Sequence, residues 1–373
     1  MNEQRRSCTE ENPSLSSILP DELIIQILLQ LPVTSLLRFK SVSKSWFSQI
    51  SNPQFAKSHF NLAASPTHYL FLKSTDEFQF QTLDIESSPP FTTAVLNYPH
   101  EQPRSGSNSI FCPSITDLEV LGSCRGFLLF LLPNFADFVV FNPSTGFQRR
   151  VQSTSFRYSA SSLYGIGYDE SNDDYLLVSV NSYGYAPTIE GFSLKTNVPF
   201  SLRMDDEYRH LDFDYEHDLF LNGCLHWLVK PSVKQVYVVL AFDLIRRSLS
   251  EIALSHDLAL ELNKKSYCLG GMRGFLGVCC IGYHGVAEIW IMKEYKVRSS
   301  WTKIVLFAHD IPRTSGFFPI CFTKRGDVFG TNELGRLLRL DGKGKLLAVW
   351  PGESRYCLLH SRMYTASLLS LPG

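Results

Sequence analysis

The chain has 373 residues, 44% of them hydrophobic and 13% aromatic, with a formal net charge of −1 at pH 7. This length suits one small and one large domain, and the near-zero charge gives no reason to expect nucleic acid or a membrane surface as partner. No apolar run approaches the roughly 20 residues of a membrane span. The nine cysteines are scattered without a C-x-x-C pair, which is typical of a reducing compartment, so we expect the cytosol or the nucleus.

Residues 1–15 are polar, carry both basic and acidic pairs, and lack the apolar stretch of a secretory signal. We expect them to form a disordered tail.

The sequence pattern of residues 16–62 predicts a small all-α unit of three short helices and a tail turn. Pro20 suits the start of the first helix, and apolar residues at three- and four-residue spacing then form one broad face through Leu31. Pro32 ends this helix and begins the second, Ser43 can cap the third, and Pro53 opens the tail. So small a unit cannot bury all its apolar surface, so the excess must dock on the rest of the chain or on a partner.

This segment resembles an F-box, the helical module that docks on the Skp adaptor of cullin–RING ubiquitin ligases. The matching positions are Leu19, Pro20, Glu22, Leu23, Ile27, Leu28, Leu31, Pro32, Leu36, Arg38, Val42, Lys44, Trp46, Pro53 and Phe55. The family often has Cys at the position of Ser43. The resemblance implies that the module's apolar residues bind the adaptor, and the candidates are Leu19, Pro20, Leu23, Ile27, Leu28, Leu31, Leu36, Leu37, Val42 and Trp46.

Residues 66–373 predict an all-β domain, because short apolar or alternating runs recur between Gly, Asn, Asp, Ser and Pro. A strand, a polar turn and a second strand repeat from Leu83, Phe141, Phe192, Phe242, Ile291 and Leu340. A period of about 50 residues fits a β-propeller of kelch type with six or seven blades. We expect 363–371 to pair with the strands of 68–84 and close the ring, 86–117 to be a long surface loop, and 257–265 to form one short helical turn at most.

The repeats resemble the F-box-associated domain of plant F-box proteins, across roughly 116–310. The resemblance depends on Gly122–Leu128, Asn142–Gly146, Gly165–Asp169, Leu221–Trp227, Phe242–Leu244, Trp290–Tyr295 and Trp301–Lys303.

Four patterns that could indicate chemistry have simpler interpretations. Cys124 lies in a G-x-C-x-G sequence, but a strand follows it where a nucleophile elbow needs a helix. Residues 342–345 lack the full phosphate-loop motif and predict a hairpin turn. The acidic run 205–218 lacks the Gly and terminal Glu of a calcium loop and predicts a solvated loop. Cys224 and His226, like the nearby Trp227, are expected in the core. We therefore expect no catalytic residue, cofactor or metal.

Together the two resemblances imply a non-catalytic substrate-recognition subunit of a Skp–cullin–F-box (SCF) ubiquitin ligase. Its partners would be a Skp-type adaptor, through it cullin and RING subunits, and an unidentified target protein held by the propeller for degradation. Two alternatives stay open. The propeller could be an enzyme or a glycan- or metabolite-binding protein with the helices as an internal cap, or the protein could use the adaptor without ubiquitination.

Overall fold

The computed structural model describes residues 20–62, 68–73, 80–86, 94–96, 119–132, 137–152, 156–159, 161–183, 185–213, 218–263, 266–272, 274–281, 286–307, 317–332, 334–350 and 361–372. The expected tail over 1–15 and Leu19 lie outside these residues. The chain forms two compact units: a helical unit (Met1–Pro66 with Ser367–Leu369) and a β unit (Thr67–Ala366 with Ser370–Gly373).

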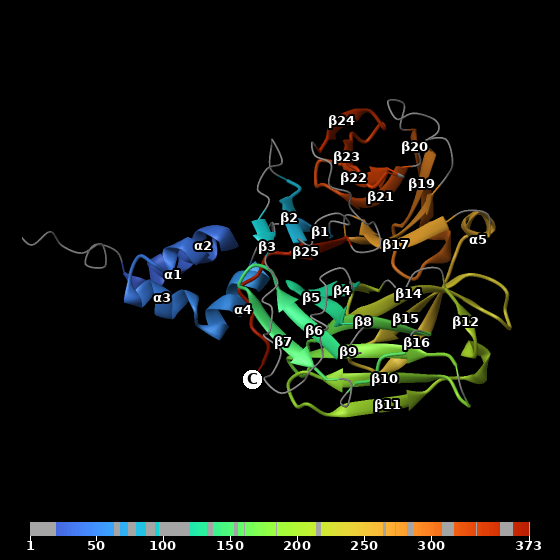
Figure 1. The fold of residues 1–373 in the computed structure, drawn as a ribbon, viewed down its shortest axis with the longest axis horizontal. Coiled ribbons are helices and arrows are strands. Elements are labelled where there is room, and N and C mark those ends of the chain that lie inside the picture. Colours follow the sequence, from blue (N-terminus) through green and yellow to red (C-terminus); the bar gives the residue numbers. More distant parts are fainter. Residues whose placement is uncertain are drawn as a thin grey trace, which may run out of the picture. The chain divides into compact units, whose positions relative to one another are not determined.

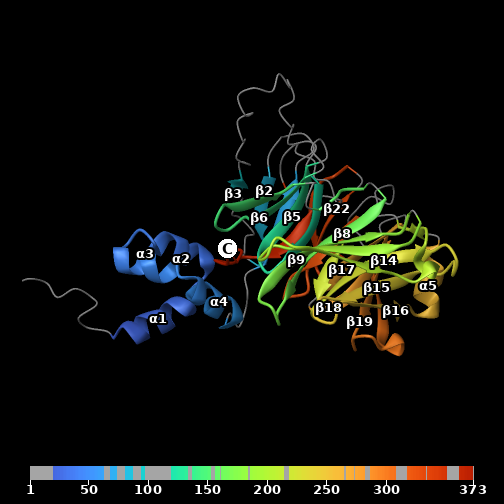
Figure 2. The same cartoon turned by 90° about the horizontal axis from the view of Figure 1, so that it is seen from below.

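The helical unit contains α1 (Asp21–Leu29), α2 (Val33–Phe39), α3 (Lys44–Ile50) and α4 (Pro53–Leu62), drawn in blue in Figures 1 and 2. Pro20 and Pro32 occupy the N-cap positions of α1 and α2. The Trp46 N–H donates to the Ser43 hydroxyl over 3.1 Å, which confirms the predicted cap of α3. The expected tail turn is a helix of 10 residues, because Pro53 is tolerated at a helix start and no later residue in it breaks the helix.

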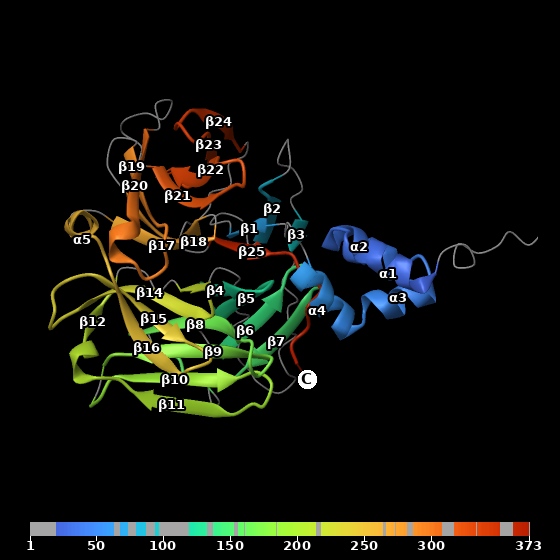
Figure 3. The same cartoon turned by 180° about the vertical axis from the view of Figure 1, so that it is seen from behind.

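The described strands of the β unit form six sheets, which are the blades of a six-bladed propeller. Figure 3 shows one of them, with β8, β9, β10 and β11 side by side. The first blade contains β1 (His68–Lys73), β2 (Phe80–Asp84), β3 (Ala94–Leu96) and β25 (Arg362–Thr365), the second β4 (Glu119–Cys124), β5 (Phe127–Leu132), β6 (Asp137–Asn142) and β7 (Phe147–Val151). The third contains β8 (Ser162–Asp169), β9 (Asp174–Asn181), β10 (Thr188–Ser193) and β11 (Pro199–Arg203), and the fourth β12 (Leu211–Asp212), β13 (Leu219–Leu221), β14 (Cys224–Pro231), β15 (Val238–Asp243) and β16 (Ser248–Ala253). The fifth contains β17 (Ser266–Met272), β18 (Phe275–Ile281), β19 (Val286–Met292) and β20 (Trp301–Phe307), and the sixth β21 (Phe317–Phe322), β22 (Val328–Asn332), β23 (Leu337–Leu340) and β24 (Leu346–Val349).

The first blade joins the two ends of the β unit. β25 pairs antiparallel with β1, with Thr365 opposite His68 and Met363 opposite Leu70. This confirms the expected closure, although the paired strand is Arg362–Thr365 and not the whole of 363–371. This pair holds the two ends of the β unit together in one blade and so closes the ring.

Apolar side chains from neighbouring blades pack together around the ring. Phe71 of β1 lies in one buried cluster with Phe130 of β5, and Leu70 of β1 lies in another with Phe329 of β22. Further clusters join the third blade to the fourth, the fourth to the fifth, and the fifth to the sixth. Between the second and third blades, the Phe127 and Tyr175 rings meet edge to face at 4.9 Å. The core therefore lies between the blades and runs around the ring.

Two-residue turns connect the inner strands of two blades. Arg125 and Gly126 join β4 to β5 with φ values of 47° and 91°, and Asn222 and Gly223 join β13 to β14 with φ values of 51° and 73°. Two consecutive positive φ angles are the signature of a type I′ hairpin turn. The G-x-C-x-G sequence around Cys124 is therefore a strand turn, as predicted.

Two parts of the β unit differ from the predictions. β3 (Ala94–Leu96) lies inside the expected loop 86–117 and pairs with β2; the rest of that loop, 87–93 and 97–117, lies outside the described residues. The expected single turn over 257–265 is the helix α5 (His256–Leu262), in which the Leu258 N–H donates to the Ser255 hydroxyl. Short 3₁₀ segments occur at Asp206–Tyr208 and Arg298–Ser300.

Candidate functional site

Large apolar side chains are exposed on the helical unit. Leu23 and Ile27 of α1 are 44% and 53% exposed, Val42 is 61% exposed before α3, and Phe47 of α3 is 55% exposed. Leu23 and Ile27 are four residues apart and therefore share one side of α1. Lys40 Nζ lies 5.9 Å from the centre of the Phe47 ring. Leaving this much apolar surface in water costs free energy that a partner would recover.

A separate set of residues is buried. Leu28, Leu36, Ile50 and Phe55 are each at most 4% exposed. The His59 Nε2 atom lies 2.8 Å from the carbonyl oxygen of Leu31, which links α4 to the end of α1. These residues hold the helices together and are not available to a partner.

The structure thus separates the ten candidate residues by exposure. Pro20, Leu23, Ile27 and Val42 are exposed, and Leu31, Leu37 and Trp46 are half-buried. Leu28 and Leu36 are buried, and Leu19 lies outside the described residues. Sequence reasoning did not single out Phe47. Its position directly after Trp46 could have indicated that it is exposed. Adjacent side chains on a helix point about 100° apart. The Trp46 ring centre lies 5.3 Å from that of Phe39 within the helical unit, so Phe47 points in another direction.

In the propeller, the Cys and His residues that could have indicated a nucleophile or a metal site have structural roles. Cys124 is 3% exposed, and burial raises the pKa of its thiol well above the usual value. His226 is fully buried, with Nε2 2.7 Å from the Tyr295 hydroxyl and Nδ1 3.0 Å from the Leu219 carbonyl. Burial lowers the pKa of His226 to about 4, so the ring is neutral at physiological pH. Cys224 is also buried.

Trp227 and the 342–345 turn also fit their predicted roles. The Trp227 indole N–H donates to the Tyr164 carbonyl over 3.0 Å and the ring is fully buried. Asp341 Oδ1 accepts hydrogen bonds from the N–H groups of Lys343 and Lys345, which makes residues 341–345 the hairpin between β23 and β24.

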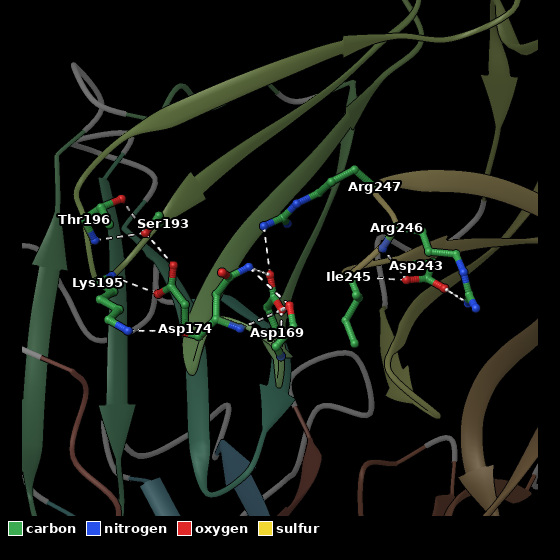
Figure 4. Close-up of polar contacts among 11 residues, drawn as sticks. Asp169, Asp174, Ser193, Lys195, Thr196, Asp243, Ile245, Arg246 and Arg247 are labelled. Atoms are coloured by element: carbon green, nitrogen blue, oxygen red, sulfur yellow. Dashed lines mark hydrogen bonds and ion pairs between the residues drawn. The ribbon is translucent and has the colours of Figure 1, made fainter.

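Carboxylates at the turns between strands also have structural roles (Figure 4). Asp169 accepts hydrogen bonds from Ser171 and Asn172 and pairs with Arg247 of the next blade at 3.1 Å. Burial alone would raise the pKa of Asp169, but these hydrogen bonds and the charge of Arg247 outweigh it and lower the pKa. Asp243 likewise accepts from the N–H groups of Ile245 and Arg246. These groups stabilise turns and one blade contact.

The prediction of a solvated acidic loop is wrong at one position. Asp205, Asp206 and Asp212 are exposed, and residues 214–217 lie outside the described residues. Asp218, however, is only 7% exposed, because it lies directly before β13 at the inner edge of its blade.

Within the described part of the chain, no three His, Cys, Asp or Glu side chains are placed to hold a metal ion. None of the helices there is long and apolar enough to cross a membrane.

The comparison with protein families matches both units. The F-box domain model matches residues 16–58, and the F-box associated beta propeller domain model matches residues 112–345. The chain is a plant F-box protein. This F-box protein is 27% identical over 305 residues to the F-box/kelch-repeat protein At3g23880 of Arabidopsis thaliana, covering 77% of this chain and 79% of that protein. It is 25% identical over 312 residues to the F-box protein CPR1 of the same plant, covering 77% and 72%.

Among solved structures, the F-box protein is similar to the β-propeller domain of Cps50 (Swd1) from Myceliophteria thermophila. The TM-score is 0.41 and the identity 10%, with 78% of this chain and 88% of that chain covered.

Proposed function

We propose that this F-box protein is the substrate-recognition subunit of an SCF ubiquitin ligase. Its F-box would dock on a Skp-type adaptor, which joins it to cullin and RING subunits, and its propeller would hold a target protein for ubiquitination and degradation. An F-box followed by a propeller fits such an adaptor. On this proposal the chain itself is not catalytic and acts in the cytosol or the nucleus.

The observation that carries the proposal is the exposed apolar set Leu23, Ile27, Val42 and Phe47. Helical partners are commonly recognised through apolar anchors at i and i+4, the spacing of Leu23 and Ile27. Interfaces of this kind concentrate their binding energy in a few large apolar or aromatic side chains.

The propeller would contribute by proximity. Holding a target beside a ubiquitin-charged partner raises the effective concentration of the target's lysines without any chemistry in the propeller itself. Loops at the ends of the blades vary independently of the buried strands, so they are where selectivity for a target would lie.

The proposal is tested by binding to a purified Skp-type adaptor. Ile27→Asp should weaken binding by about 2 kcal/mol or more, since it places a charge in an apolar interface. Trp46→Ala should weaken it as well, whereas Leu28→Asp should unfold the helices because Leu28 is 1% exposed. The measurement is a titration by biolayer interferometry on the full chain.

The matched control is Val233→Asp, which changes an apolar residue of the propeller that is 71% exposed. Circular dichroism must show that Ile27→Asp keeps its helices. Full adaptor binding by a folded Ile27→Asp protein, or equal losses in both variants, would remove this assignment.

A further inference from the structure

The propeller contains a cavity of about 240 Å³. It is lined by the edge strands of five blades, β25, β4, β13, β17 and β21, and by the first residue of β1. A single water molecule needs only about 10–15 Å³ of cavity volume, so this cavity has room for a small organic molecule. Its walls combine apolar side chains with a few polar groups, the usual composition of small-molecule sites.

One carboxyl group in this cavity has a hydrogen-bonding position to fill. Asp218 Oδ2 accepts a hydrogen bond from the Ile166 N–H over 3.1 Å. Asp218 Oδ1 is buried and has no hydrogen-bond partner in the described structure. A buried polar atom without a partner costs about 1–3 kcal/mol, so this oxygen favours a partner supplied by whatever fills the cavity.

Two glycines make room for this carboxyl. A Cβ atom on Gly122 would lie 2.2 Å from Asp218 Oδ1, and one on Gly165 would lie 2.6 Å from Oδ2. Any other residue at either position would push the carboxyl away. The placement of Asp218 is therefore built into the inner strands of two neighbouring blades.

The charge around the carboxyl favours an anion. Arg125 and Arg362 both line the cavity, but the Arg125 guanidinium lies 3.9 Å from the centre of the Tyr168 ring, so Arg362 is the arginine whose charge acts on Asp218. Burial raises the pKa of Asp218 to about 8, although the charge of Arg362 acts against this. At pH 7 the carboxyl is thus mostly protonated. Because Oδ2 accepts from Ile166, the proton belongs on Oδ1, which then donates into the cavity.

We propose that this cavity binds a small metabolite with an oxyanion group, a carboxylate or a phosphate ester, between the Asp218 carboxyl and the guanidinium group of Arg362. Guanidinium groups pair with both kinds of oxyanion through charge-assisted hydrogen bonds. The proposal is independent of adaptor binding, which involves the other unit of the chain.

Isothermal titration of the full chain at pH 7 tests this with three probes: citrate, inorganic phosphate and 3-phosphoglycerate, with glycerol as the uncharged control. We expect at least one anion to bind with a Kd below about 1 mM. If citrate binds more tightly than phosphate, the preferred oxyanion is a carboxylate, and in the opposite case it is a phosphate. Arg362→Gln should weaken binding at least about tenfold. Arg203→Gln, at an arginine whose side chain is 72% exposed, should leave it unchanged.

The pH dependence provides a second readout. Binding by the natural protein should weaken by up to about tenfold per pH unit above pH 8, as Asp218 loses its proton. The amide that replaces the carboxyl in Asp218→Asn keeps a donor and an acceptor at all pH values. Asp218→Asn should therefore bind at pH 7 and lose little affinity at pH 9.

Other titratable groups do not reproduce this difference. Those that face the cavity are His68, Cys124, Cys268 and Tyr364. Burial lowers the pKa of His68 and raises the pKa values of Cys124 and Tyr364, so these three stay uncharged from pH 7 to 9. A hydrogen bond with Cys279 lowers the pKa of Cys268, but this change is common to the natural protein and Asp218→Asn.

The proposal is overturned if no anion gives binding heat up to about 10 mM, as expected of a cavity that holds water only. It is also overturned if Arg362→Gln and Arg203→Gln lose equal anion affinity. The same anion affinity at pH 7 and pH 9 in the natural protein would overturn it as well. If Arg362→Gln does not fold, the proposal is tested by comparing the anion affinity of the natural protein and of Asp218→Asn at pH 7 and pH 9.

Discussion

Carboxylates in the propeller behave in opposite ways according to their hydrogen bonds. Asp169 and Asp243 receive several N–H and O–H donors at turns, and hydrogen bonding lowers the pKa of each below its ordinary value against the effect of burial. Asp218 accepts a hydrogen bond from the Ile166 N–H, but burial outweighs it and raises the pKa of Asp218 to about 8. The first two stabilise the fold at neutral pH and lose this contribution only in acid, whereas Asp218 costs stability when it ionises.

Asp218→Asn should therefore stabilise the propeller increasingly as the pH rises. The pKa of Asp218 is about 8 in the folded state and near 3.8 in the unfolded state, so the folded state binds more protons between these values. Stability from this group falls with rising pH, by up to about 1.4 kcal/mol per pH unit. Urea unfolding of both proteins at pH 5.5 and 8 measures the difference. A gap of equal size at the two pH values would show that Asp218 is ionised throughout.

Short elements in the helical unit depend on their ends. α3 has seven residues, too few to be stable alone, and one side-chain cap at Ser43. Prolines set the starts of α1 and α2, where their fixed φ and missing N–H are harmless. At this scale local sequence decides where each helix begins, and packing decides whether it persists.

Ser43→Ala should loosen α3 by about 1 kcal/mol, because it removes the acceptor of the Trp46 N–H. Hydrogen–deuterium exchange of the peptide that covers residues 44–50 measures this as an increase of about fivefold in exchange rate. Ser45→Ala, an exposed change inside the same helix, should leave the exchange unchanged or slow it. Faster exchange in both variants would point to a cause other than the cap.

At the scale of the molecule, the propeller is a ring joined by one strand pair. β25 comes from the end of the chain and pairs with β1, and the Tyr364 ring stacks on Tyr69 at 5.6 Å. Each blade buries its apolar side chains against its neighbours, so a break in the ring exposes core on both sides of the break.

Truncation after Ser361 should lower the free energy of unfolding of the propeller by about 3 kcal/mol or more, since it removes β25 and the buried Tyr364 side chain. Truncation after Thr365 keeps the strand and is the matched control. Thermal unfolding followed by near-UV circular dichroism compares the two. Equal losses would mean that the last residues, and not the strand pair, stabilise the protein.

Local patterns in the sequence by themselves determined the helix starts, the period of about 50 residues, the hairpin at 341–345 and the pairing of the last strand with the first. The first three depend on residues a few positions apart or on a repeated pattern of them, and the fourth follows from the repeat, because a propeller ring must close. Only the tertiary structure decided that Ile27 is exposed while adjacent Leu28 is buried, that β3 joins its sheet, and that Asp218 lies in a cavity. The reason is that burial is fixed by contacts between segments far apart in the chain, and Asp218 meets Gly122 and Gly165 only when three blades come together.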